Sequence, residues 1–237
     1  MPTPFEAVIF DLDGVLADSE PWWNQIDAKL LAEHGVHYCG EYHQNVLGVS
    51  YRVAVEFYKN AFNLSASVEE LMRRRGEIAT DFFVNHVALF PSAKATLQQL
   101  SKMRLQLAVA TSSVSASARP FIERTGITNF FRVIVTGDEV QRGKPDPDIY
   151  LRTAKRLGIS PEACLVIEDA LAGVTAAKAA NMRVAAIPDA RFVGRGEYET
   201  EANYVLENLS EIPALICQVN GASSQEHARL DRTFSRD

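Results

Sequence analysis

The stretch AVIFDLDGVLADSEPWW, residues 7–23, runs an apolar tetrapeptide directly into Asp11 and Asp13, which a single leucine separates. A short apolar run of this kind is typical of a strand that is buried on both faces. At a spacing of i, i+2 the two carboxylates point to the same side if the chain stays extended. The most buried strand of the chain is therefore expected to deliver two carboxylates to one place.

Working outward from this strand, further apolar runs rich in Val, Ile and Ala alternate with helical patterns. The apolar runs lie at 105–110, 132–135, 164–167 and 183–187. The helical patterns lie at 92–103, 119–126, 148–158 and 170–181. Strands that alternate with helices predict right-handed crossovers and a parallel sheet covered on both faces. We therefore expect an α/β fold with a Rossmann-like parallel sheet.

The interval from about 16 to 88 breaks this alternation, because it has helical patterns and no comparable strand. Ser19 is a candidate N-cap for a helix that begins at PWWNQIDAKL. A second helix is expected to begin at a capping box formed by Ser67 and Glu70. We interpret this interval as an all-helical cap inserted just after the first strand.

These patterns divide the chain into three parts. Residues 1–15 and 89–216 are predicted to form the Rossmann-like core, and residues 16–88 the cap. Residues 217–237 are polar and lack periodicity, so we expect a disordered tail.

The composition limits the possible partners and settings. The formal net charge is −6 and the pI is about 5.5, which argues against nucleic acid or an anionic membrane surface as a partner. The first apolar run stops at Asp11, so we expect neither a signal peptide nor a membrane span there. Cys39, Cys164 and Cys217 are odd in number and far apart, which favours a reducing cytoplasm over disulfide bonds or zinc. A monomer is the default expectation.

Polar side chains follow four of the apolar segments, where an open α/β sheet binds its ligands. They are Asp11 and Asp13, then Thr111, Ser112 and Ser113, then Lys144 within GKPDPD, and finally Glu168 and Asp169. Carboxylates that converge on one edge repel each other unless a cation lies among them or some are protonated. A set of oxygen ligands favours a hard ion, and Mg²⁺ is the simplest choice.

These residue types suit phosphoryl transfer. A carboxylate beside Mg²⁺ and a lysine can attack phosphorus, because both cations draw charge from the phosphoryl oxygens. A second aspartate two residues away can protonate the leaving oxygen and later activate water. The pair at the end of the first strand thus predicts a nucleophile and a proton carrier.

The chain resembles the haloacid dehalogenase-like hydrolases, in the branch of small sugar-phosphate phosphatases and β-phosphoglucomutases. FDLDGVLADSE, VATSS, RGKPDPDIYL and VIEDALAGV occur in the order of that family, and the resemblance covers roughly residues 5–216. It implies that Asp11 is a nucleophile that becomes an aspartyl phosphate. It also implies that Asp13 is the general acid and base and lends its backbone carbonyl to Mg²⁺.

The same resemblance implies roles for the other strand-end residues. Thr111 would hold the phosphoryl group by its hydroxyl, helped by the Ser112 backbone. Lys144 would bridge the nucleophile and the phosphate. Asp169 would complete the metal ligands, with Glu168 either coordinating the ion or supporting its ligands.

Two residues of the cap are candidates for substrate binding. DSEPWW resembles DSEPLW of the 2-deoxyglucose-6-phosphate phosphatases, which would place Trp23 facing the sugar. LGVSYR resembles the cap loop that holds the distal part of the substrate, with Arg52 as its contact. The run Arg73, Arg74 and Arg75 is interpreted as a solvated helix face, with the alternative that one of the three reaches the substrate.

Together these features predict a Mg²⁺-dependent hydrolase of phosphomonoesters that acts on small phosphorylated metabolites, in particular sugar phosphates. One alternative is a β-phosphoglucomutase-type mutase, which hands the phosphoryl group to another sugar hydroxyl. Those mutases tend to carry a histidine where this chain has Trp23, which favours hydrolysis. A binding protein without activity is a second alternative, but unused buried carboxylates would only cost stability.

Overall fold

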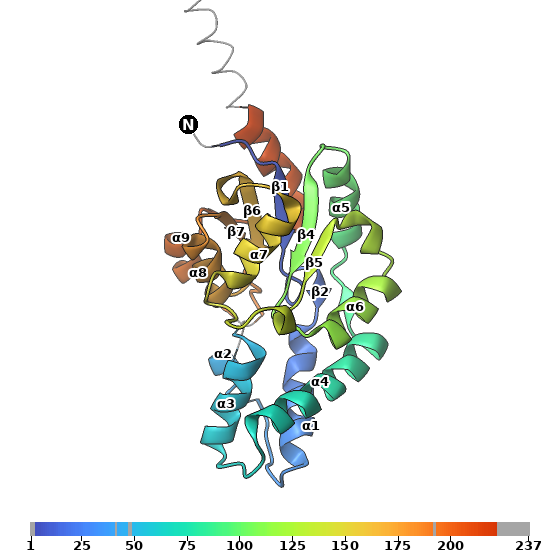
Figure 1. Ribbon diagram of the computed structural model, residues 1–237, viewed down its shortest axis with the longest axis vertical. Coiled ribbons are helices and arrows are strands. Elements are labelled where there is room, and N and C mark those ends of the chain that lie inside the picture. The colour runs from blue at the N-terminus through green and yellow to red at the C-terminus, as the bar shows by residue number, and fades with distance from the viewer. Residues whose placement is uncertain (1–2, 41, 47–48, 192, 222–237) are drawn as a thin grey trace, which may run out of the picture.

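The computed structural model describes residues 3–40, 42–46, 49–191 and 193–221 (Figure 1). One sheet of parallel strands forms its centre, in the order β5-β4-β1-β6-β7-β8. These strands are β5 (Val133–Val135), β4 (Gln106–Ala110), β1 (Ala7–Phe10), β6 (Cys164–Glu168), β7 (Arg183–Ala186) and β8 (Tyr204–Val205). The first strand lies in the interior of the sheet, and the predicted α/β class with a parallel sheet is confirmed.

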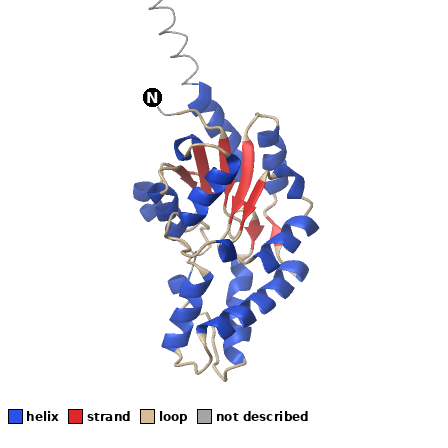
Figure 2. Ribbon diagram, viewed as in Figure 1, coloured by secondary structure: helices blue, strands red, loops and turns tan. Residues whose placement is uncertain are grey.

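Side chains alternate between the two faces of the sheet, as the pleat requires. In β1, Ala7 and Ile9 belong to one buried cluster, and Val8 and Phe10 belong to the other. Full burial of an aliphatic or aromatic side chain of this size contributes roughly 1.5–3 kcal/mol to folding. The central strand is apolar on both faces because both faces are covered by helices (Figure 2).

Separate sets of helices cover the two faces. Buried residues on one face come from α7 (Asp148–Leu157), α8 (Leu171–Ala179) and α9 (Gly196–Glu201). Buried residues on the other face come from α5 (Ala93–Ser101), α6 (Ser115–Arg124) and the helical segment 212–221. The second face also receives residues of the helices that precede residue 86 in the chain, so its core continues beyond the sheet.

Among the described residues, four helices lie beyond one end of the sheet, in the lower half of Figure 1. They are α1 (Glu20–Ala32), α2 (His43–Val46), α3 (Tyr51–Ala61) and α4 (Val68–Asn85). A short antiparallel pair, β2 (Ala17–Asp18) with β3 (Ala88–Leu89), joins the two ends of this helical region. The sequence shows no strand there, because a two-residue strand is too short to produce a pattern.

The predicted tail beginning at residue 217 differs from the structure. Residues 217–221 are helical and continue the segment that begins at 212. Asn220 closes a pair of hydrogen bonds with Phe5: the Phe5 amide donates to Asn220 Oδ1 at 2.7 Å, and Asn220 Nδ2 donates to the Phe5 carbonyl at 3.0 Å. This long-range pairing has no local sequence signal. Residues 222–237 of the predicted tail lie outside the described residues.

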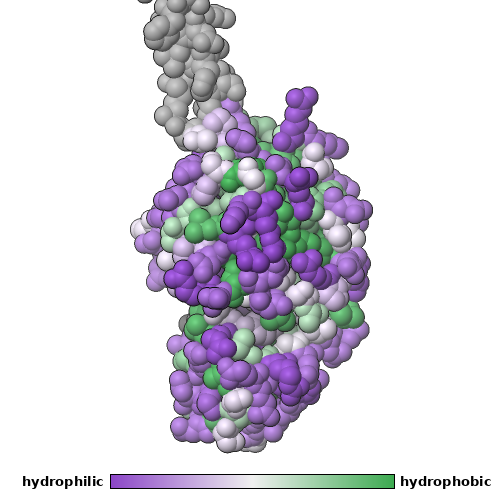
Figure 3. All heavy atoms as spheres, in the orientation of Figure 1, coloured by the Kyte–Doolittle hydropathy of each residue, from purple (hydrophilic) through white to green (hydrophobic). Residues whose placement is uncertain are grey.

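The α6 helix begins at Ser115, earlier than the expected start at residue 119. Pro120 reads in the sequence as a helix-start signal, yet it lies inside the helix. The visible surface is largely hydrophilic with smaller apolar areas (Figure 3). Within the described residues, no helix is both long enough and apolar enough to span a bilayer.

Candidate active site

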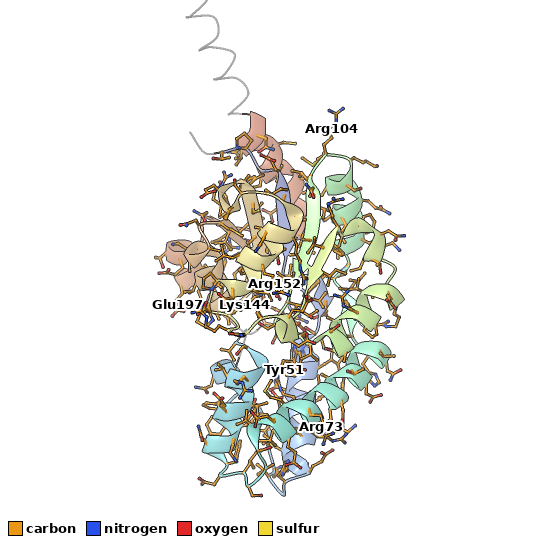
Figure 4. The ribbon with its side chains drawn as sticks, viewed as in Figure 1. Tyr51, Arg73, Arg104, Lys144, Arg152 and Glu197 are labelled. Carbon is orange, nitrogen blue, oxygen red and sulfur yellow. The ribbon has the colours of Figure 1, made fainter. Side chains whose placement is uncertain are left out.

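A cavity lies where the carboxyl ends of the strands meet the helical region. In Figure 4, Lys144 and Tyr51 lie near this junction, on the sheet part and the helical part respectively. The residues that follow the strands form one wall: Asp11, Asp13, Ser112, Ser113, Lys144, Glu168, Asp169 and Ala170. Residues of the helical region form the other wall: Glu20, Trp23, Asp27, Val46, Val49, Tyr51 and Arg75.

The carboxylate of Asp11 lies at the base of this cavity and is only 4% exposed. The Asp11 amide donates to the Ile167 carbonyl at 2.9 Å, which keeps the chain extended past β1. Lys144 Nζ donates to Asp11 Oδ1 at 2.6 Å and to Glu168 Oε1 at 2.5 Å. Burial raises the pKa of Asp11 well above its usual value, while Lys144 opposes the shift. Burial alone would lower the pKa of Lys144, but the charges of Asp11 and Glu168 raise it.

Glu168 is held on both oxygens. Tyr150 donates its hydroxyl to Oε1 at 2.5 Å, and the backbone amides of Asp169 and Ala170 donate to Oε2 at 3.1 and 3.2 Å. A Cβ at Gly173 would lie 1.8 Å from Oε1, so any larger residue would push α8 away from the carboxylate. This contact explains the glycine by close packing rather than by backbone conformation.

Asp13 accepts four hydrogen bonds on its carboxylate. Ser19 Oγ and Trp23 Nε1 donate to Oδ1 at 2.9 and 3.2 Å. Ser113 Oγ and Thr111 Oγ1 donate to Oδ2 at 2.8 and 3.1 Å. Ser19 was expected to cap α1, but its side chain makes no cap hydrogen bond there. The second aspartate is thus oriented by groups from the chain around β2 and from the β4 end.

Thr111 and Ser112 differ in their access to the cavity. Thr111 is fully buried behind Asp13, and its hydroxyl also accepts the Ser113 amide at 3.0 Å. Ser112 lines the cavity, and its buried Oγ has no hydrogen-bond partner among the described residues. Ser112 is therefore the better placed of the two to offer a hydroxyl to a ligand.

A cluster of carboxylates can hold a cation. One ligand oxygen each from Asp11, Glu168 and Asp169 lies within 4.8 Å of the others. Burial raises the pKa of Asp169, and the nearby Glu168 and Glu20 charges add to the shift. A Cβ at Gly14 would lie 1.9 Å from Asp169 Oδ2, so the backbone packs directly against this carboxylate. The all-oxygen donor set and the mutual repulsion fit a hard divalent cation.

The helical wall of the cavity carries a buried ion pair that the sequence does not reveal. Arg75 is 5% exposed and Asp27 is 0% exposed. Arg75 Nε and Nη2 donate to Asp27 Oδ1 and Oδ2 at 2.7 and 3.2 Å. The guanidinium carbon lies 4.6 Å from the ring centroids of both Trp23 and Tyr51.

The interpretation of residues 73–75 as a solvated face is therefore wrong for Arg75. Arg73 and Arg74 do lie on the outer face, where they pair with exposed Glu77 and, for Arg74, Glu33. Successive helical residues are about 100° apart, so one member of a run of three can point inward. The signal was the spacing of buried residues Leu71, Arg75, Ile78 and Ala79, in which Arg75 takes a core position.

Arg52 is not among the residues that line this cavity. Its side chain is 51% exposed and pairs with Glu69 at 3.2 Å and with Glu56 at 3.6 Å. It lines an adjoining depression that shares Tyr51, Ser112 and Lys144 with the cavity. The structure thus brings Asp11, Asp13, Ser112, Lys144, Glu168, Asp169 and Trp23 to one cavity and leaves Arg52 outside it. Sequence reasoning gave no indication of Asp27, Tyr51 and Tyr150 as site residues. It placed Ser113 at a strand end without a role, expected Ser19 to be an N-cap, and gave no specific role to Arg75.

Comparisons with known proteins agree with this geometry. The sequence pattern of the haloacid dehalogenase-like hydrolases matches residues 8–187. The phosphorylated carbohydrates phosphatase of Thermotoga maritima is 35% identical over 177 residues, which cover 75% of this chain and 82% of that protein.

Solved structures of CbbY from Rhodobacter sphaeroides have a similar fold. The complex with phosphate is 26% identical, with a TM-score of 0.78, and covers 88% of this chain and 96% of that chain. A mutant in complex with xylulose-(1,5)bisphosphate is 25% identical, with a TM-score of 0.78, and covers 87% and 96%. The chain belongs to the haloacid dehalogenase-like hydrolases, and it is a phosphatase of the branch that contains sugar-phosphate phosphatases and β-phosphoglucomutases.

Proposed function

We propose that the chain is a Mg²⁺-dependent phosphatase that hydrolyses small phosphorylated sugars or polyols through an aspartyl phosphate on Asp11. The observation that carries this proposal is the Asp11 carboxylate at the base of the cavity, 2.6 Å from Lys144 Nζ. The relative from T. maritima, a phosphatase of phosphorylated carbohydrates, supports the substrate class. We further assign residues 1–15 and 89–216 to the catalytic core and residues 16–88 to its cap.

The first step is attack by the free Asp11 oxygen on phosphorus. The new bond joins this oxygen to phosphorus, and the bond from phosphorus to the sugar oxygen breaks. Lys144 neutralises charge on the phosphoryl oxygens, and the Ser112 hydroxyl donates to one of them. Asp13 gives its proton to the departing sugar oxygen, which leaves as an alcohol.

The second step removes the phosphoryl group. Asp13, now ionised, takes a proton from water as that water attacks phosphorus, and phosphate leaves Asp11. The hydroxyls of Ser19, Thr111 and Ser113 can rotate to donate to ionised Asp13 or to accept from protonated Asp13. The same contacts therefore support both forms of the proton carrier.

The carboxylates of Asp11 and Asp169 and the backbone carbonyl of Asp13 would hold the magnesium ion. When bound, the ion would supply positive charge that offsets the phosphoryl oxygens and keeps Asp11 ionised. Glu168 has both oxygens engaged by Lys144, Tyr150 and two backbone amides, so it serves to orient Lys144 and the loop of Asp169.

Phosphorus NMR of the purified protein with Mg²⁺ tests this proposal. Hexitol 6-phosphate and 2-deoxyglucose 6-phosphate should each release inorganic phosphate. A second arm supplies β-glucose 1-phosphate with a trace of glucose 1,6-bisphosphate. Glucose 6-phosphate appearing there without free phosphate would identify a mutase. If none of the substrates reacts, including an aryl phosphate, the proposal that the chain is an enzyme is refuted.

A further inference from the structure

The two ends of the cavity carry different charge. The strand end brings the carboxylates of Asp11, Glu168 and Asp169 together with the single ammonium group of Lys144. The helical end carries Arg75, whose charge is matched by Asp27 in a bidentate pair. The remaining carboxylate of the helical wall, Glu20 at the start of α1, acts on Asp169, whose pKa its charge raises.

Arg75 is held by an ion pair and by two aromatic rings. Asp27 binds two of its nitrogens and also accepts the Tyr58 hydroxyl at 3.0 Å, which fixes the carboxylate. The rings of Trp23 and Tyr51 lie on the guanidinium. Arg75 lines the cavity, and its Nη1 has no hydrogen-bond partner among the described residues, so this nitrogen remains available as a donor.

Tyr51 supplies a second unused polar group. It lines the cavity, it is 6% exposed, and its buried hydroxyl has no hydrogen-bond partner within the described part of the chain. Burial raises the pKa of Tyr51, so the group stays a neutral phenol. A buried hydroxyl without a partner is unfavourable, and a polar ligand that reaches it removes this cost.

Among the described residues that line the cavity, Lys144 and Arg75 carry the only Lys or Arg charges. Lys144 belongs to the phosphoryl end. Arg52 lines the adjoining depression, which shares Tyr51 with the cavity, and its charge is matched there by Glu56 and Glu69. The helical end therefore offers hydrogen-bond donors without a net positive charge.

We propose that Arg75, Asp27 and Tyr51 form a specificity site that binds the neutral, hydroxyl-bearing end of a phosphate monoester and disfavours a second phosphate. The neutralised guanidinium and the phenol suit hydroxyl oxygens, whereas a second phosphate would lose its hydration without gaining a counter-charge. The fold does not impose this choice, since CbbY is solved with xylulose-(1,5)bisphosphate. This inference rests on the proposed phosphatase function.

The first test compares the wild-type protein on three substrates: hexitol 6-phosphate, hexose 1,6-bisphosphate and an aryl phosphate. We expect kcat/KM for the hexitol phosphate to exceed that for the bisphosphate by about 10-fold or more, because a desolvated charge without a partner is costly. An equal or higher kcat/KM for the bisphosphate would overturn the inference. The aryl phosphate has no hydroxyl-bearing end, so its kcat/KM reports on phosphoryl transfer without contacts at the specificity site.

Variants then locate the effect. Tyr51→Phe should raise KM for hexitol 6-phosphate about 3- to 10-fold, because one hydrogen bond is lost. The same variant should lower kcat/KM for the aryl phosphate less than that for the hexitol phosphate, and it should fold, since the Tyr51 hydroxyl has no partner to lose within the described residues. Arg75→Met should lower kcat/KM for the hexitol phosphate by more, and its neighbour Arg74→Met, on the outer face, is the matched control. An equal loss on all substrates in both Tyr51→Phe and Arg75→Met would mean that the residues are structural.

Asp27→Asn tests the role of charge balance directly. It leaves Arg75 positive and unmatched, so the ratio of kcat/KM for the bisphosphate to that for the monophosphate should rise about 10-fold. Calorimetric binding of the same compounds to Asp11→Asn separates the two proposals. If the wild type shows no turnover but Asp11→Asn binds the monophosphate more tightly than the bisphosphate, the proposed function is refuted and the specificity site stands. If Asp11→Asn binds both compounds equally, the specificity site is refuted.

Discussion

The two buried charge clusters on the cavity, one at the strand ends and one in the helical region, are built from the same kinds of residue. At the strand ends, Lys144 bridges Asp11 and Glu168, and Asp169 adds another carboxylate. In the helical region, Arg75 and Asp27 form a balanced pair packed between aromatic rings. The strand-end cluster has more negative than positive charge, so it favours a bound cation and reacts with an anionic group. The Arg75–Asp27 pair has matched charges and presents hydrogen-bond donors.

The two clusters also differ in whether they are expected to serve catalysis or stability. Surplus buried carboxylates are unfavourable for folding unless a cation joins them, so the strand-end cluster is expected to be retained for catalysis. A matched, hydrogen-bonded pair is costly to break but stable when complete. Substitutions in the two clusters should therefore affect different measurements.

The largest effect is expected at the strand ends, from Asp11→Asn. We expect kcat to fall by at least about 10⁴-fold, because the amide cannot replace the nucleophilic carboxylate. Thermal unfolding should show an intact fold, since Lys144 keeps Glu168 as a partner. Asp81→Asn, an exposed aspartate of α4, is the control. A near-normal rate for Asp11→Asn would rule out the mechanism.

Removal of metal should come next. A chelator should reduce turnover by about 10³-fold or more, and Mg²⁺ should restore it, because the ion offsets charge worth several kcal/mol. Asp169→Asn should raise the Mg²⁺ concentration needed for half-maximal rate. Full activity after exhaustive chelation would show that the carboxylate cluster works without a cation.

In the helical region, Asp27→Ala should act mainly on stability. We expect the free energy of unfolding to drop by about 3–5 kcal/mol, since Arg75 is left buried without its partner. Urea denaturation measures this loss. An unchanged midpoint would mean that water or another group compensates Arg75.

Asp13→Asn tests the proton carrier through the leaving group. With sugar phosphates, which leave poorly, we expect a loss of about 10²-fold or more, because general acid catalysis is removed. With an activated aryl phosphate the loss should be clearly smaller. If the rate falls by the same factor with both substrates, Asp13 has a different role.

The smallest effect is expected from Arg52→Ala, on the exposed side of the helical region. Its ion pairs have exposed partners, so little change in thermal stability is expected. Its place outside the cavity predicts less than about twofold change in KM for a sugar phosphate. A larger rise in KM would restore Arg52 as a substrate contact, as the resemblance of its loop implies.

Much of the site could be predicted because its residues follow strands. Asp11, Thr111 and Glu168 come directly after apolar runs, with Ser112 and Asp169 one residue further. The parallel strands end on one edge of the sheet. The contacts of Asp13 could not be predicted in this way. Ser19 matches the pattern of an N-cap, and only the folded chain shows that its hydroxyl reaches Asp13 instead.

The sequence by itself determined the α/β class, the positions of the strands and the carboxylates at the strand ends, because these depend on local apolar patterns and on a period of two. The tertiary structure decided which arginine of residues 73–75 faces the cavity and what neutralises it. Asp27 lies 48 residues away from Arg75 in the chain, so their pairing depends on how α1 packs against α4. No local sequence pattern encodes that packing, because the two charges attract each other as a buried pair only after folding has removed both of them from water.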